Sequence, residues 1–223
     1  MESKSQNEAL RIIHNCALNY GQNLVHKNIL FITMQNNRAV HFEAAFLPRN
    51  FLHLTGVQTR LTSREFYTMA FRDRMSEQDF RFASDGTTDK KLDILPTLMK
   101  IHLTARMVGD YDYSKSLLVT DKIAGTVAAA MGFRKNGDSD FYVPNTALNT
   151  DLRVLAQNPV QRIAAMFIKK KQDQRYRELT YIAKGLTIDE PAFSSIIQEK
   201  VDLKELKASF PIPQMPMKER LDI

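Results

Sequence analysis

The segment KNILFITMQNNRAVHFEAAFL, residues 27–47, contains the pattern that decides the fold. Two apolar runs, residues 29–34 and 39–46, flank the polar tetrapeptide QNNR. Its two asparagines tolerate the left-handed backbone conformation that a tight turn needs. Pro48 cannot donate to a strand ladder and is expected to end the second run. The segment therefore predicts two antiparallel strands joined by a tight turn.

Two further hairpins are predicted beyond this segment. Asn136 and Gly137 form a strong hairpin signal between strand-like runs within residues 128–144. Residues 160–183 contain another pair of strand-like runs, joined by the polar turn KKKQDQ. Consecutive hairpins with helices outside them are typical of an α+β fold with a mainly antiparallel sheet.

Helices are predicted before and between the hairpins. Apolar side chains recur with helical spacing over residues 6–20, and Gly21 is expected to stop that helix. Thr62 or Ser63 is expected to cap a second helix. Residues 91–112 are predicted as a further helical region, and a short helix is expected near the C-terminus. These helices complete the α+β prediction.

The composition is that of a globular chain with a moderate positive charge. The 223 residues carry a formal net charge of +6, and the isoelectric point is near 9.4. This size suits one domain of ordinary size or one domain with appendages, and the charge favours an anionic partner. No window approaches the roughly 18 consecutive apolar residues of a membrane span, and the N-terminus lacks the apolar core of a signal peptide. A cytoplasmic location without a membrane partner is therefore expected.

The sequence lacks the motifs of several common classes of functional site. Neither nucleotide-binding fingerprint, GxGxxG or GxxxxGK[ST], is present, and the histidines lack the spacing of zinc hydrolases. The one cysteine, Cys16, excludes an internal disulfide and is predicted to be a buried structural thiol rather than a nucleophile. No metal or other cofactor is therefore expected.

The segment FLHLT around His53 is the first candidate for chemistry. If it forms a strand, period-two alternation places Phe51, His53 and Thr55 on one face. An aromatic ring, an imidazole and a hydroxyl side by side suit a bound nucleotide, and Arg49 and Asn50 stand just upstream. The same pattern also fits a histidine hydrogen-bonded within a half-buried sheet, so both interpretations stay open.

Two other polar clusters are weaker candidates. A strand that ends at Pro144 would gather polar side chains in the turn after it, although ordinary turn chemistry is the favoured explanation of this cluster taken alone. Lys115 could hold a phosphate, or it could be a solvated charge at a strand end. The polar residues near Pro144 that could contact a nucleotide are Tyr142, Asn145, Thr146 and Arg153.

The last hairpin carries most of the net charge. Residues 160–184 hold seven basic and two acidic side chains, a net +5, interleaved with two tyrosines. Cations for phosphates and aromatic faces for unpaired bases fit RNA, but a lysine-rich turn also keeps a sheet edge soluble. The cations at its turn are Lys169, Lys170 and Lys171.

Several blocks together resemble a known family. The block FLPRNFLHLTGV is followed by KSLLVTDKIAGTVAAAMGF, FYVPNTALNTDLR and RELTYIAKG. In this order, with NFLHLTG as the most specific part, they resemble the fourth phage-type group of barnase–EndoU–colicin–RelE (BECR) ribonuclease domains, found in phages and mobile elements. The resemblance covers about residues 25–185. It implies N-terminal and middle helices packed on a curved, mainly antiparallel sheet, in one domain over residues 1–185. A helix and a proline-rich tail would follow over residues 186–223.

The resemblance also implies an activity, the cleavage of RNA without a metal through attack of the 2′-hydroxyl on the adjacent phosphate. His53 matches the motif histidine and would transfer the proton, and Thr55 would orient the phosphate or the histidine. Lys115 and Arg49 are the cation candidates by their chemistry. Asn145 and Thr146 match the PNT block and would position the nucleotide.

The biological role implied is that of a phage or mobile-element toxin or effector, with RNA as substrate and an inhibitor or immunity protein as partner. A catalytically inactive module that binds RNA or protein is the alternative. A third interpretation is an interaction protein, in which the tail from Phe210 docks on a partner or on a second copy to form a homodimer.

Overall fold

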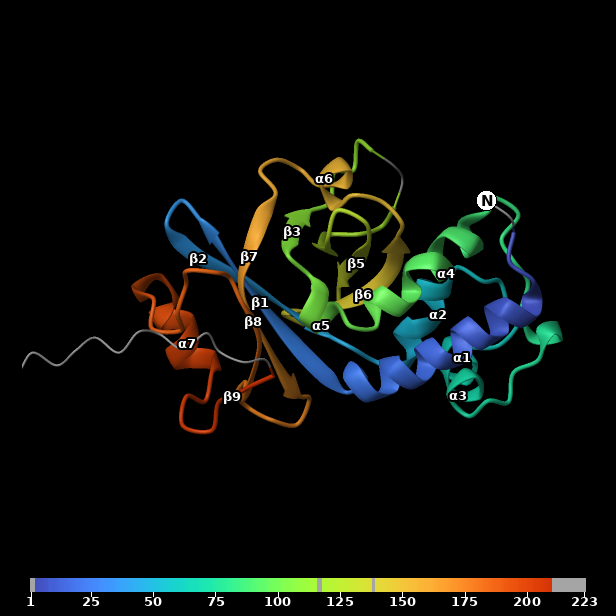
Figure 1. Ribbon diagram of the computed structural model, residues 1–223, viewed down its shortest axis with the longest axis horizontal. Helices are drawn as coiled ribbons and strands as arrows, with labels where there is room; N and C mark the ends of the chain where they lie inside the picture. The colour runs from blue at the N-terminus through green and yellow to red at the C-terminus, as the bar shows by residue number, and fades with distance from the viewer. Residues whose placement is uncertain (1–2, 116–117, 138, 210–223) are drawn as a thin grey trace, which may run out of the picture.

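The computed structural model describes residues 3–115, 118–137 and 139–209, and Figure 1 shows their arrangement. Short 3-10 turns occur at Pro48–Asn50, Glu77–Asp79 and Pro191–Phe193. The helices and strands, in chain order, are α1 (Gln6–Asn23), β1 (Lys27–Gln35), β2 (Arg38–Ala45), α2 (Phe51–Thr55), α3 (Ser63–Phe71), α4 (Thr87–Leu98), α5 (Ile101–Thr104), β3 (Met107–Asp110), β4 (Lys122–Gly125), β5 (Ala130–Lys135), β6 (Phe141–Leu148), α6 (Leu152–Leu155), β7 (Gln161–Lys170), β8 (Glu178–Ile182), α7 (Ser194–Lys200) and β9 (Lys207–Ala208).

The three predicted hairpins are confirmed. Strands β1 and β2 pair antiparallel, with Gln35 opposite Arg38 at the turn. Asn36 and Asn37 have φ angles of 49° and 62°, as the tight turn requires. Strands β5 and β6, and strands β7 and β8, form the other two antiparallel pairs. Local turn chemistry was therefore sufficient to find the hairpins.

All the strands belong to one curved sheet in the order β1-β2-β6-β5-β4-β3-β7-β8-β9. Strand β1 also pairs with β7, so the sheet curves round until these two strands meet. Among the strands of the described residues, only the β2–β6 and β8–β9 pairs are parallel. The predicted α+β fold with a mainly antiparallel sheet is therefore confirmed.

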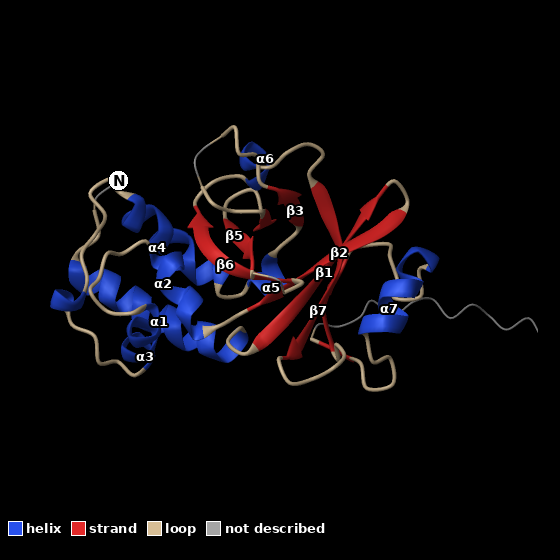
Figure 2. Cartoon of the chain, turned by 180° about the vertical axis from the view of Figure 1, so that it is seen from behind, coloured by secondary structure: helices blue, strands red, loops and turns tan. Residues whose placement is uncertain are grey.

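Helices cover β1 on both faces, as Figures 1 and 2 show, with α1–α4 grouped on one side and α7 on the other. Ile29 and Phe31 pack in the large core that α1, α3 and α4 share with the sheet. Leu30 and Ile32 point the other way, into a smaller core with α7. Double coverage explains why β1 is an almost continuous apolar run rather than an alternating one.

The first and third helices begin with the capping boxes that their sequences favour. The Ser5 hydroxyl accepts a hydrogen bond from the backbone of Glu8, and that of Thr62 accepts one from Glu65, which confirms the predicted cap. The prediction that Gly21 stops the first helix is wrong, because α1 continues to Asn23. A Cβ on Gly21 would lie 2.7 Å from the Tyr67 hydroxyl oxygen, so the glycine permits close packing of α1 on α3.

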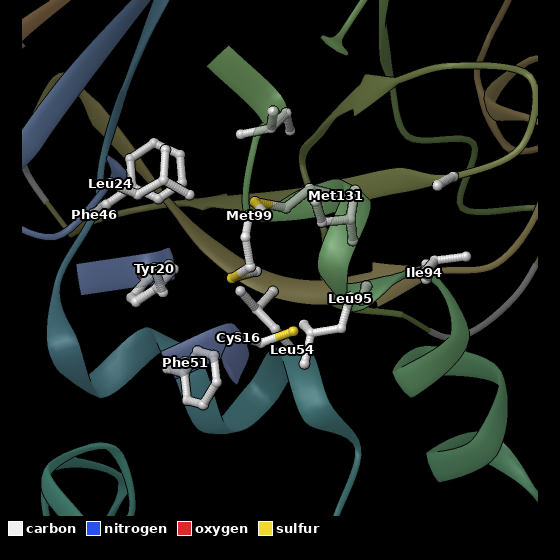
Figure 3. Packing of buried hydrophobic residues seen from close by; sticks show 14 of the residues in the cluster. Cys16, Tyr20, Leu24, Phe46, Phe51, Leu54, Ile94, Leu95, Met99 and Met131 are labelled. Carbon is white, nitrogen blue, oxygen red and sulfur yellow. The ribbon is translucent and has the colours of Figure 1, made fainter. Parts of the chain in front are cut away.

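The predicted strand over residues 51–55 is wrong, because these residues form helix α2. Phe51, Leu54 and Thr55 are fully buried, whereas His53 is exposed. Positions i, i+3 and i+4 share one face of a helix, so this burial pattern has a helical period and not a period of two. Figure 3 shows Phe51 and Leu54 directed into the core beside Tyr20 and Leu95.

Two other local predictions also need correction. The predicted helical region over residues 91–112 ends early, since Met107 and Val108 pair with β4 and β7 as part of β3. The predicted turn after Pro144 is absent, because β6 continues through it to Leu148. Pro144 lies where the β5–β6 register shifts, and such an irregularity tolerates a residue without an N–H donor.

The remaining predictions concern the cysteine, membrane spans and the C-terminal segment. Cys16 is buried, as predicted, and burial raises the pKa of its thiol to about 12. Among the described residues, no helix is long and apolar enough to cross a membrane. The predicted short C-terminal helix is present as α7, packed on the sheet. The proline-rich tail from residue 210 lies outside the described residues.

Candidate active site

A cavity of about 610 Å³ opens beside His53. Its walls come from the end of α2 and the turn after it, the start of α4 with the loop before it, residues 118–120 and the middle of β6. Residues from four separate parts of the chain therefore meet here. The titratable and hydrogen-bonding side chains in its lining include those of His53, Gln58, Asp85, Lys91, Thr120 and Asn145.

His53 stands in the last turn of α2, on the side of the helix that faces away from the core. Gly56 ends the helix with a φ of 72°, a left-handed conformation that glycine adopts without strain. Partial burial lowers the pKa of His53, and the positive charge of Lys91 lowers it further. The imidazole is therefore neutral at pH 7, which is the form that accepts a proton.

Lys91 is the main residue of the cavity that the sequence did not reveal. Its ammonium donates a hydrogen bond to the backbone carbonyl of His53 at 3.0 Å, across 38 residues of chain. A Cβ on Gly56 would lie 2.8 Å from the Lys91 Cδ, so the glycine also makes room for this side chain. Burial lowers the pKa of Lys91, and the charge of Asp85 opposes that effect. The only sequence signal for it is a lysine pair at the start of a predicted helix.

The fully buried Thr88 ties α2 to α4 beneath the cavity. Its hydroxyl donates to the Gly56 carbonyl oxygen at 2.7 Å and accepts from the Ala83 N–H at 2.8 Å. The first bond joins the end of α2 to the first turn of α4, and the second joins that turn to the loop before it. Because His53 and Lys91 stand on these two helices, Thr88 contributes to holding their backbones in register.

Asn145 and Thr146 line the opposite wall on β6. The Asn145 amide donates to the Val119 carbonyl oxygen at 2.5 Å and accepts from the Thr120 hydroxyl at 3.2 Å. Both ends of the amide are therefore used to hold residues 118–120 in place as a wall of the cavity. Thr146 is 6% exposed and its hydroxyl donates to the Ala147 carbonyl oxygen at 3.5 Å, so it offers little polar surface to a ligand.

Asp85 places one carboxylate in the cavity lining. Its Oδ1 accepts a hydrogen bond from the Thr87 N–H at 2.9 Å, and hydrogen bonding to Thr87 lowers the pKa of the carboxyl. The group is therefore charged at pH 7. It offsets part of the charge of Lys91, so an anionic ligand needs further cations nearby.

The other candidates close to His53 in sequence lie outside this lining. Thr55 is fully buried, and its hydroxyl donates to the Leu52 carbonyl oxygen at 2.8 Å. Asn50 is 6% exposed and accepts from the Leu47 N–H through its Oδ1. Arg49 is exposed on the preceding 3-10 turn. Thr55 and Asn50 thus shape the backbone around α2.

The candidates more distant in sequence are also dispersed. Tyr142 packs edge-on against Phe42 with ring centroids 5.7 Å apart. Lys115 is exposed in the turn after Tyr111. Arg153 forms an ion pair with Asp151 on α6. None of these three side chains lines the cavity beside His53.

The three lysines of the last hairpin differ from one another. Lys169 lies 4.7 Å from the Tyr176 ring centroid and donates to the Gln174 carbonyl oxygen, so it is engaged locally. Lys170 and Lys171 are exposed. All three stand at the end of β7 and the turn after it, outside the cavity lining. The structure thus brings His53, Asn145 and Thr146 together and leaves the other nine candidates elsewhere.

Replacing Lys91 with glutamine should raise the pKa of His53, because it removes a positive charge that disfavours the imidazolium. The titration of the His53 ring protons by NMR measures the change. Lys90→Gln is the matched control, since Lys90 is exposed and does not line the cavity. An equal response in the two variants, or none in Lys91→Gln, would contradict the assigned interaction.

The arrangement combines a neutral base, a partly buried ammonium and hydrogen-bonding groups in an open cavity. Such a set can move a proton and stabilise negative charge on a bound oxyanion. Within residues 3–115, 118–137 and 139–209, no group of three or more His, Cys, Asp or Glu side chains is placed to hold a metal ion.

A family model described as phage-Barnase-EndoU-ColicinE5/D-RelE like nuclease4 matches residues 12–185. The match includes every residue of the His53 cavity and ends before α7. No curated protein and no solved structure matches the chain.

Proposed function

The chain belongs to the phage-Barnase-EndoU-ColicinE5/D-RelE like nuclease family, and from this premise we propose that it is a metal-independent endoribonuclease with its active site at His53. The observation that carries the proposal is the pairing of His53 with Lys91. A neutral imidazole and a partly buried ammonium, which bonds to the His53 carbonyl oxygen, face the same polar cavity.

The reaction proposed is transesterification within the RNA chain. His53 takes the proton of a 2′-hydroxyl, whose oxygen attacks the adjacent phosphorus. The bond from phosphorus to the 5′-oxygen breaks, and that oxygen takes a proton from water in the open cavity. The hydroxide left behind takes back the proton that His53 accepted, which restores the neutral imidazole. The products are a 2′,3′-cyclic phosphate and a 5′-hydroxyl. Lys91 supplies the positive charge that stabilises the phosphorane as its negative charge develops.

The remaining residues of the cavity would position the substrate. Asn145 holds residues 118–120 against the cavity, and Thr88 keeps α2 and α4 together, so the reacting groups need little rearrangement. Cleavage of cellular RNA would make the protein a toxin or effector of a phage or mobile element, with an inhibitor as its partner.

The experiment that tests this function is incubation of the purified protein with single-stranded RNA in the presence of EDTA. The expected result is cleavage to fragments with 2′,3′-cyclic phosphate and 5′-hydroxyl ends, identified by mass spectrometry. An oligonucleotide of the same sequence that lacks 2′-hydroxyl groups is the control and should stay intact, because it has no internal nucleophile. If the protein is correctly folded and the RNA stays intact, the catalytic proposal is wrong and the cavity is a binding site instead.

A further inference from the structure

The cavity beside His53 has a second hollow next to it. A second hollow of about 380 Å³ shares the lining residues Gln58 and Thr59 with it. This second hollow continues over Arg60 and Arg81. The two hollows therefore adjoin each other along the segment after α2, and we treat them together as one groove that begins at His53.

The segments that line this groove are held in place by hydrogen bonds to each other, although they lie about 20 residues apart in the chain. The backbone groups of Gln58 and Arg81 bond to each other in both directions, at 2.9 and 2.8 Å. The Thr59 hydroxyl donates to the Asp79 carbonyl oxygen at 2.6 Å and accepts from the Leu61 N–H. The groove is thus preorganised, and binding would cost little ordering of its backbone.

The cations of the groove are available to a ligand. Arg60 and Arg81 are both exposed, and neither forms an ion pair within the described part of the chain. The nearby Asp79 carboxylate instead accepts hydrogen bonds from the Ser76 N–H and hydroxyl, at 2.7 and 2.9 Å. A guanidinium presents a planar set of donors that fits phosphate oxygens in pairs.

We propose that this groove is the track of a single-stranded RNA, with Arg60 and Arg81 binding phosphates next to the one that reacts at His53. The inference rests on the proposed function. A groove that follows the backbone with cations is how single-stranded nucleic acids are held without sequence preference. The two arginines also add positive charge to the groove, which makes up for the part of the Lys91 charge that Asp85 offsets in the first cavity.

The test is the double variant Arg60→Ala/Arg81→Ala, studied with a longer single-stranded RNA and with a dinucleoside monophosphate. The KM for the longer RNA should rise at least about tenfold, because two phosphates no longer have a guanidinium to bind them. The kcat for the dinucleoside monophosphate should not change, since it occupies only the His53 cavity. The matched control, Arg11→Ala/Arg38→Ala, removes the same charge from two exposed positions outside the groove.

Binding of a fluorescent oligonucleotide that lacks 2′-hydroxyl groups separates this inference from the catalytic proposal. The dependence of log affinity on log salt should weaken by about 1.4 in the groove variant, or about 0.7 for each phosphate that is no longer neutralised. If the salt dependence weakens in this way but the unaltered protein cleaves no RNA, the RNA track is supported and the catalytic role is rejected. Equal changes in the groove and control variants, or no binding by the unaltered protein, would overturn the track.

Discussion

Replacing His53 with alanine is expected to lower the rate of RNA cleavage by about 10²- to 10⁴-fold, the usual contribution of a positioned general base. The side chain is exposed at the end of a helix, so the free energy of unfolding should change by no more than about 0.5 kcal/mol. Single-turnover kinetics measure the rate, and thermal unfolding checks the fold. A variant that is folded and cleaves at the normal rate would remove His53 from the mechanism.

Two further measurements make the His53 assignment specific. Added imidazole should restore part of the rate of His53→Ala, because the variant leaves an opening beside Lys91 in an exposed cavity. His26→Asn, at another exposed position, is the control and should keep the full rate, because asparagine tolerates the φ of 57° found there. The pH profile should show full activity at pH 7. The rate should fall once the pH drops below the lowered pKa of His53.

Acidification from pH 6.5 to pH 4 is expected to cost the fold on the order of 3 kcal/mol through His102 alone. This residue of α5 is 9% exposed. Burial, helped by the charge of Lys27 and opposed by that of Glu178, lowers its pKa from 6.5 to about 4. Between these values the unfolded chain binds a proton that the folded chain does not, so stability falls as the pH falls.

The variant His102→Leu should remove this contribution. Urea unfolding of both proteins at pH 7 and at pH 4 measures it, and the difference between the proteins cancels the carboxylates that titrate in both. The Nδ1 of His102 has no hydrogen-bond partner among the described residues, so an apolar replacement should cost little at pH 7. Equal loss of stability in the two proteins would show that His102 titrates normally in the folded state.

Features that depend on neighbouring residues were predictable from the sequence. The Asn36-Asn37 and Asn136-Gly137 turns and the capping box at Thr62 need only residues within four positions of each other. Short-range geometry selects these conformations whatever surrounds them. The same signals identified the α+β class, because the order of hairpins and helices restricts how the layers can pack.

The interpretation of residues 51–55 failed because a five-residue apolar segment contains too few positions to separate two periods. Leu52 and Leu54 fit a strand as well as a helix. Packing of Phe51 and Leu54 against α1 and α4 selected the helix. His53 is directed away from the core in a strand as well as in a helix, so it remains a candidate. Thr55 was chosen because a strand would place it beside His53, and that reason does not apply to a helix.

The sequence by itself determined the hairpins, the layered class and the choice of His53 as a candidate, the last through its likeness to the nuclease family. Only the tertiary structure decided which groups accompany His53. Lys91 lies 38 residues away and Arg81 belongs to a loop joined to Gln58 by backbone bonds. No local sequence pattern predicts these long-range contacts, because they follow from how whole helices and loops pack against one another.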